Sequence, residues 1–137
     1  MLTKNFEKKS ETTYAIFRIF TALLFLQHGL QKMFGAFGGV NGTGLTPPLF
    51  SQFWWAGLIE LAAGFGIALG LFTRPLAIIA ALEMVFAYFL VHAAKGAFPI
   101  LNQGELAALY FFAFLFIAAR GAGKWSLEKA ISGKELF

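Results

Sequence analysis

The segment from Phe17 to Lys32 constrains the fold most, because it is apolar enough to enter a membrane and yet carries three ionisable side chains. On a helix that turns by about 100° per residue, Arg18, His28 and Lys32 fall on one face, within an arc of roughly 80°. Phe25 lies on the same face. Hydrocarbon cannot solvate ionisable groups, so this face must look toward other helices or water. The rest of the chain is therefore expected to cover it.

The composition indicates an integral membrane protein. Of the 137 residues, 58% are hydrophobic and 13% are charged, whereas a soluble domain of this size needs a far more polar surface. The net charge of +4 does not indicate a nucleic-acid partner, because the Lys and Arg residues gather at expected helix ends and tails. The absence of cysteine excludes dithiol chemistry, thiolate metal sites and iron–sulfur clusters.

The apolar segments predict an all-α fold, an integral membrane four-helix bundle with a polar interior. Each segment is long enough to cross the hydrocarbon layer. The expected helices span about 13–34, 51–72, 75–94 and 104–120. Residues 1–12 form a basic tail, and residues 121–137 form an amphipathic tail suited to a membrane surface. The first apolar segment is too long for the core of a secretory signal, so we expect the chain to retain it.

The distribution of basic residues predicts the orientation in the membrane. With four spans, one side carries eight Lys and Arg residues in its tails and in the Arg74 turn, and the other side carries only Lys32 and Lys95. Basic residues are enriched on the cytoplasmic side of membrane proteins. Both termini are therefore expected in the cytoplasm.

A rise of 1.5 Å per residue gives the depth of each ionisable group and matches acids with bases at three levels. The expected pairs are Arg18 with Glu83, His28 with Glu60, and Lys32 with Glu105. An unpaired charge in hydrocarbon costs several kcal/mol, so pairing is the expected solution. The pairs either fix the register of the helices or serve a function.

Histidine beside a membrane-embedded carboxylate can move protons near neutral pH, so His28 and Glu60 are the candidate catalytic residues. Other side chains are candidates for holding a ligand. These are Arg18, Lys32, Glu83 and Glu105 among the charged residues, and Phe25, Phe53 and Phe86 among the aromatic ones. His28 and His92 lie at similar depth and allow a two-histidine haem in principle. We expect no metal site, because the ligand spacing of common sites is missing.

Three sequence patterns occur together in this chain. Phe17–Lys32 reads F-R-x-x-x-A-x-x-F-x-x-H-G-x-x-K, Trp55–Gly64 reads W-x-G-x-x-E-x-x-x-G, and Gly70–Pro75 reads G-L-x-T-R-P. In this combination the chain resembles the DoxX family of small bacterial inner-membrane proteins, over about residues 13–120. The resemblance implies a multi-pass four-helix bundle linked to respiratory or oxidative-stress chemistry. Some family members are similar to the membrane subunit of a thiosulfate:quinone oxidoreductase.

Two functions from different classes remain open. The first is a redox-associated membrane protein that binds a quinone or a similar lipophilic molecule between its helices, as a subunit or anchor of an oxidoreductase system. No motif for an intrinsic cofactor is visible, so the chain is not assigned catalysis on its own. The second is a non-catalytic scaffold or a small transporter. Expected partners are the lipid bilayer, a lipophilic small molecule, and an oxidoreductase subunit or a second copy of the chain.

Overall fold

The computed structural model describes residues 2–135, and over this range it contains helices and no strands. The helices are α1 (Leu2–Phe34), α2 (Gln52–Leu69), α3 (Thr73–Ala87), α4 (Pro99–Asn102), α5 (Glu105–Arg120) and α6 (Leu127–Ser132). α3 continues as a π-helical turn, Tyr88–His92, and a 3₁₀ turn, Ala93–Lys95. The prediction of an all-α protein is confirmed.

Three helical segments are long and apolar enough to cross a membrane: Lys9–Phe34, Gln52–Leu69 and Thr73–Lys95. These correspond to the first three expected spans. The fourth expected span corresponds to α5, which has 16 residues. At 1.5 Å per residue α5 is about 24 Å long, shorter than a hydrocarbon layer of about 30 Å.

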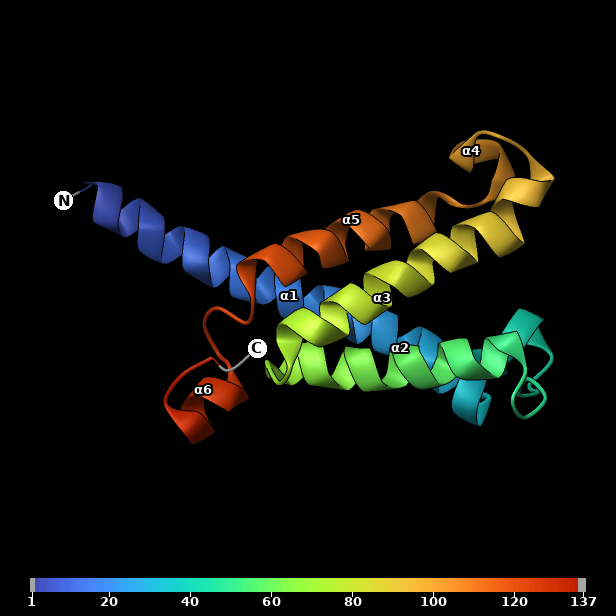
Figure 1. The fold of residues 1–137 in the computed structure, drawn as a ribbon, viewed down its shortest axis with the longest axis horizontal. Coiled ribbons are helices and arrows are strands. Elements are labelled where there is room, and N and C mark those ends of the chain that lie inside the picture. The colour runs from blue at the N-terminus through green and yellow to red at the C-terminus, as the bar shows by residue number, and fades with distance from the viewer. Residues whose placement is uncertain (1, 136–137) are drawn as a thin grey trace.

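The long helices form two pairs, α1 with α2 and α3 with α5, and α2 also contacts α3 (Figure 1). α2 and α3 meet at the turn of residues 70–72 and diverge along their length (Figure 1). We call the end with this turn the closed end, and the end with residues 35–51 and 96–104 the open end. The fully buried core between the helices includes Phe25, Ile67, Phe114 and Ile117.

Glycines bring α1 and α2 into backbone contact. A Cβ atom on Gly29 of α1 would lie 2.6 Å from the backbone nitrogen of Leu61 in α2. A Cβ atom on Gly64 of α2 would lie 2.7 Å from Cβ of Leu26 in α1. Small residues allow this approach. Gly64 thereby lets α2 pack closely against α1 one turn after Glu60.

The N-terminal end of the chain differs from expectation. α1 begins at Leu2 instead of residue 13, so the described part of the basic tail is helical and extends beyond the other helices (Figure 1).

The C-terminal tail packs against the closed end, where Ser126 Oγ donates a hydrogen bond to the Gly70 carbonyl at 2.9 Å. Glu135 accepts hydrogen bonds from Lys129 and from the Ala122 backbone N–H. Burial raises the pKa of Glu135, but these two hydrogen bonds and the positive charges of Lys129 and Arg74 together lower it by more, so its pKa lies below the usual value.

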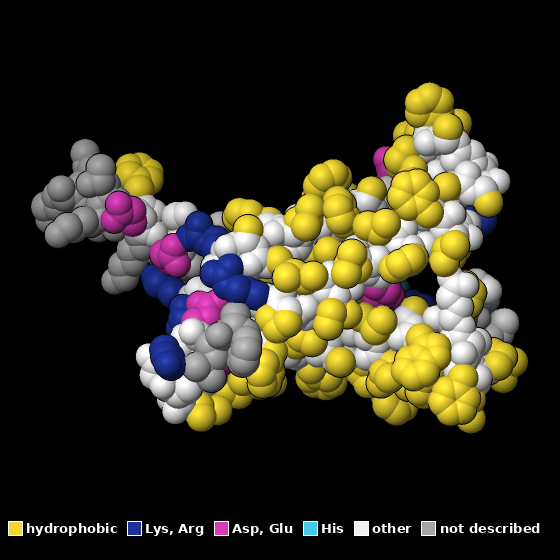
Figure 2. Space-filling model, in the orientation of Figure 1, with side chains coloured by type: hydrophobic (Ala, Val, Ile, Leu, Met, Phe, Trp, Pro, Cys, Tyr) yellow, Lys and Arg dark blue, Asp and Glu magenta, His cyan; other side chains and the backbone are white. Residues whose placement is uncertain are grey.

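Hydrophobic side chains cover the face of the molecule shown in Figure 2, along α2, α3 and α5. Lys and Arg side chains gather at the closed end beside α6 (Figure 2). Such an apolar surface is what lipid contact requires, because lipid tails replace the polar solvent. A membrane protein is therefore the class that this surface supports.

We expect Gly29→Ala to destabilise the protein, because the added methyl group would force α1 away from the backbone of α2. Overpacking of this kind costs about 1–3 kcal/mol of unfolding free energy. Thermal unfolding in detergent, followed by circular dichroism, measures the effect. Ala62→Val is the matched control, since Ala62 is exposed on α2 and its added methyl groups meet no neighbouring helix. Equal stability of Gly29→Ala and the wild type would contradict the close contact.

Candidate functional site

Arg18 of α1 is fully buried at the closed end and binds backbone carbonyls. Its guanidinium donates hydrogen bonds to the carbonyls of Ile67 and Ala68 near the end of α2, the latter at 3.1 Å. It also donates to the carbonyls of Lys124 and Trp125, both at 3.0 Å. The predicted pairing of Arg18 with Glu83 is therefore wrong.

The end of a helix explains why backbone atoms replace a carboxylate here. The last carbonyls of α2 have no N–H partner within the helix and carry a partial negative charge. A guanidinium offers five N–H donors in a fixed fork, so it can satisfy several carbonyls at once. Arg18 thus joins α1, the end of α2 and the C-terminal tail.

Lys32 of α1 forms an ion pair with Glu60 of α2. Its Nζ atom lies 2.5 Å from one carboxylate oxygen of Glu60 and 2.6 Å from the other. The pair is well shielded, with side-chain exposures of 15% and 4%. Two predicted pairings are therefore wrong, since Lys32 does not pair with Glu105 and Glu60 does not pair with His28. Glu105 is exposed in the first turn of α5.

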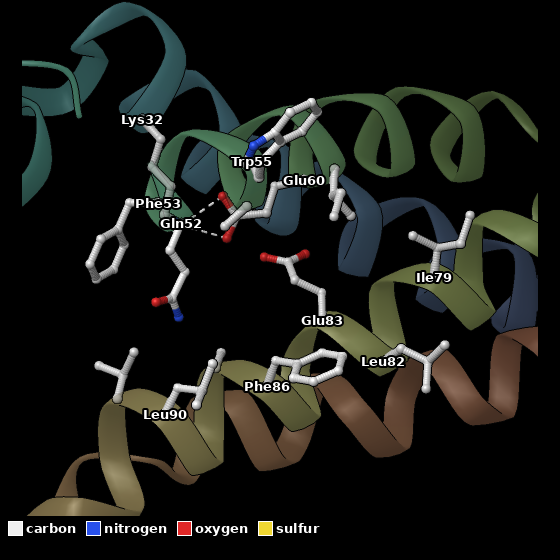
Figure 3. A pocket seen from close by; sticks show the side chains of 14 residues that line it. Lys32, Gln52, Phe53, Trp55, Glu60, Ile79, Leu82, Glu83, Phe86 and Leu90 are labelled. Carbon is white, nitrogen blue, oxygen red and sulfur yellow. Dashed lines mark hydrogen bonds and ion pairs between the residues drawn. The ribbon is translucent and has the colours of Figure 1, made fainter. Parts of the chain in front are cut away.

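Glu83 of α3 points toward Glu60 across the gap between α2 and α3 (Figure 3). Its Oε2 atom is buried and has no hydrogen-bond partner among the described residues. Both hydrogen bonds of Lys32 therefore go to Glu60, and Glu83 has no ion pair among the described residues. Burying a polar atom without a hydrogen bond lowers the stability of the folded protein. The carboxyl group of Glu83 is therefore available to form a hydrogen bond with a bound molecule.

A cavity of about 400 Å³ lies between α2 and α3, with these charged groups on its wall. It is visible as a hollow with acidic and basic side chains inside it, between α2 and α3 near the open end (Figure 2). Its lining is mostly apolar. The lining side chains include Lys32, Glu60, Glu83, Gln52, Phe53, Trp55, Ile79, Leu82, Phe86 and Leu90 (Figure 3).

A smaller cavity of about 200 Å³ lies on the other side of the ion pair. Lys32, Glu60 and Phe53 line both cavities, so the ion pair stands where the two meet. The smaller cavity adds polar and aromatic groups from α1, from the π-helical turn that follows α3, from the residue after α4, and from α5. These are Phe25, His28, His92, Gln103 and Tyr110.

The structure brings most predicted site residues to these cavities. His28 is half-buried and meets the edge of the Tyr110 ring, with ring centroids 6.0 Å apart. Phe25 is part of the core and packs on Tyr110 and Phe114. Of the predicted residues, Arg18 and Glu105 line neither cavity.

Asn102 was missed by the sequence analysis, although it is fully buried. Its side chain donates to the Gly96 carbonyl and the Tyr88 hydroxyl and accepts from the Gly104 N–H. The backbone carbonyl oxygen of Asn102 lies 3.0 Å from Nδ1 of His92. Asn102 thereby fixes the loop that closes the smaller cavity. An amide residue between Pro99 and Gly104 in an uncharged loop is the only signal that the sequence offered.

Within residues 2–135, no group of three or more His, Asp or Glu side chains is placed to hold a metal ion. The ionisable groups that line the two neighbouring cavities include one lysine (Lys32), two carboxyl groups (Glu60 and Glu83) and two histidines (His28 and His92). They can hold a polar head by hydrogen bonds, and they can accept or deliver protons.

Comparison with known proteins gives two matches and one negative result. A family model described as DoxX matches residues 13–93. An uncharacterised protein of Haemophilus influenzae is 41% identical over 130 residues, which cover 90% of this chain and 94% of that protein. No solved structure matches the chain.

We expect Arg18→Met to lower the free energy of unfolding by about 3 kcal/mol or more, because it leaves buried carbonyls without donors. Arg74→Met is the matched control. Arg74 also donates to carbonyls, those of Ala118 and Ala119, but its side chain is 42% exposed and water can replace it. Thermal unfolding of both variants measures the difference. An effect of Arg18→Met no larger than that of Arg74→Met would count against the role of Arg18.

Lys32→Met is expected to lower the free energy of unfolding by about 3–5 kcal/mol, because it leaves the buried Glu60 carboxylate without a positively charged partner. The double variant Lys32→Met with Glu60→Leu should recover most of this loss, because no buried charge remains. Lys129→Met is the control, and loss of its more exposed pair with Glu135 should cost about 1 kcal/mol at most. Chemical denaturation in detergent gives all four values. A double variant no more stable than Lys32→Met alone would refute the pairing.

Proposed function

The chain belongs to the DoxX family of membrane proteins, and on that basis we propose that it binds a quinone or a similar lipophilic molecule in the cavity between α2 and α3. In this proposal it is a redox-associated subunit or anchor of an oxidoreductase system. The spanning helices form a four-helix bundle in the bacterial inner membrane, with both termini in the cytoplasm. The gathering of basic side chains at the closed end supports this orientation (Figure 2).

One observation carries the proposal, namely a cluster of charged groups on the wall of an otherwise apolar cavity. Ligand sites are typically apolar clefts of about 300–1,000 Å³ with a few converging polar groups. The cavity of about 400 Å³ fits this description. Around it, Trp55, Leu82, Phe86 and Leu90 are exposed on the outer surface of the protein, which we place against lipid. A ligand dissolved in the bilayer could therefore enter from the side.

The residues divide into two roles in this proposal. Lys32, Glu60 and Glu83 face the polar head of the ligand, while Phe53 and Phe86 contact its ring or chain. His28 lies in the smaller cavity beyond the ion pair, so it is placed to pass protons between the head and that cavity. The charged groups would then hold the ligand and balance its proton changes.

A separate observation supports the second candidate function, a small transporter. The two cavities meet at Lys32 and Glu60, and Gln103 at the open end lines the smaller one. Ionisable residues inside a membrane protein often mark the path of a substrate or a proton. Transport would use the same residues, but it would require passage between the two cavities.

The proposal predicts a lipophilic ligand that co-purifies with the protein. Protein extracted gently with native lipid, then denatured and analysed by mass spectrometry, should release about one quinone or similar molecule per chain. Glu60→Gln should reduce this amount several-fold by disturbing the ion pair, whereas Glu7→Gln, at an exposed position on α1, should not.

A direct titration completes this test. A short-chain quinone should bind to ligand-depleted protein in lipid nanodiscs, beyond its partition into empty nanodiscs. Absence of both a co-purified molecule and titratable binding would reject the lipophilic site. In that case, proton or solute flux in proteoliposomes would decide for or against the transporter.

A further inference from the structure

We propose that the cavity between α2 and α3 recognises a molecule whose head accepts hydrogen bonds, as a carbonyl oxygen does, and that Glu83 donates one of these bonds from a protonated carboxyl group. Lys32 supplies the second donor, an N–H group that its ion pair leaves unused. The proposal rests on the proposed lipophilic site and names the chemistry of the ligand head. It gives Glu83 the role of a specificity-determining residue.

The balance of charge on the cavity wall is the first argument. Among the residues that line this cavity, the ionisable ones are Lys32, Glu60 and Glu83. One base thus faces two acids, and ionisation of both acids would leave a negative charge unbalanced among apolar side chains. Such a charge is costly, so one of two neighbouring carboxyl groups keeps its proton. Both bonds of Lys32 go to Glu60, which makes Glu60 the ionised acid and Glu83 the protonated one.

The unused hydrogen-bond donors are the second argument. A protonated carboxyl group has an O–H donor, yet Oε2 of Glu83 is buried without a partner among residues 2–135. Glu83 points toward Glu60 in Figure 3, but within that range no hydrogen bond joins the two. Lys32 has three N–H groups, and two of them bind the two oxygens of Glu60. The wall therefore offers one donor from α1 and one from α3.

These donors determine which head the cavity holds best. A carbonyl oxygen has two lone pairs and no proton, so it can accept from both donors at once. A methylene group in its place would leave both donors unpaired. The rest of the lining is mostly apolar and includes Ile59, Ile79 and Leu82, which suit a ring or an alkyl chain. The ligand class is an apolar molecule with a carbonyl group at one end, and an oxidised quinone belongs to it.

A matched pair of probes tests the proposal without redox chemistry. 4-Heptylacetophenone carries a carbonyl group, and 1-ethyl-4-heptylbenzene has a methylene group in the same place. Equilibrium dialysis against ligand-depleted protein in nanodiscs gives both dissociation constants, expressed relative to the concentration of each probe in the lipid of empty nanodiscs. We expect the ketone to bind about tenfold more tightly or better, as two added hydrogen bonds predict.

Two substitutions at Glu83 distinguish a protonated carboxyl group from a carboxylate. Glu83→Gln keeps a neutral donor of the same length, so it should retain the ratio between the two probes within about threefold. Glu83→Met has no donor and should lower the ratio to about threefold or less, since only the bond from Lys32 remains. Glu7→Gln and Glu7→Met, at an exposed position on α1, are the matched controls and should leave the ratio unchanged. Thermal unfolding verifies that each variant is folded.

Infrared spectroscopy gives a readout that is independent of binding strength. The C=O stretch of a protonated carboxyl group is separated from the bands of carboxylates. The wild type at neutral pH should show such a band, and Glu83→Gln should lack it. Bound ketone should shift the band, whereas the bound hydrocarbon should not. Absence of a band that depends on Glu83 would overturn the protonated state, and absence of a shift would overturn the hydrogen bond.

The remaining failures are distinguishable from one another. If both probes bind the wild type equally, the proposed head chemistry is wrong and the lipophilic site remains. If folded Glu83→Gln loses the preference as fully as Glu83→Met, Glu83 is no neutral donor and its role is rejected. If neither probe nor a short-chain quinone binds above empty nanodiscs, the proposed function fails together with this proposal.

Discussion

The inability of hydrocarbon to solvate charge governs this structure, because every ionisable group on the inner face of α1 must find its partner inside the protein. Arg18 meets this requirement with backbone carbonyls at the end of α2 and in the C-terminal tail. Lys32 meets it with Glu60. These two contacts tie α1 to α2 at separate levels, and the helix pair so formed is one wall of both cavities.

Close packing and charge pairing depend on each other along this helix pair. Gly29 and Gly64 let the backbones of α1 and α2 approach, and the Gly29 contact is made at Leu61 and at the backbone of Glu60 itself. A short helix separation brings the lysine Nζ within hydrogen-bond distance of both carboxylate oxygens. α3 carries no comparable contact toward α2 near the open end. Its carboxyl group, on Glu83, is consequently left without a partner, and the cavity occupies the space between.

Helical periodicity was enough to predict the fold class, three spans and the inward direction of the face that carries Arg18, His28 and Lys32. It could not predict the partners. Depth along a helix is uncertain by about one turn, and a lysine side chain can reach across that distance. Every residue has a backbone carbonyl, so residue types do not indicate which carbonyls a side chain will bind. The partners of Arg18 could therefore not be predicted from the sequence. Asn102 was missed for a related reason, since its contacts join loop segments that periodicity does not describe.

Because α2 and α3 are joined at one end and diverge toward the other, a small change in the angle between them would produce a larger displacement at their far ends. The two helices are joined by the short turn of residues 70–72, and α2 runs 18 residues from there, or about 27 Å. A change of about 5° in the angle between them would move the far ends apart by roughly 2 Å. Glu60 and Glu83 sit on opposite arms, so the same small rotation sets both the width of the side entrance and the separation of the two carboxyl groups. If the proposed ligand enters from the bilayer, such a rotation would change its access and the electrostatics of the site together.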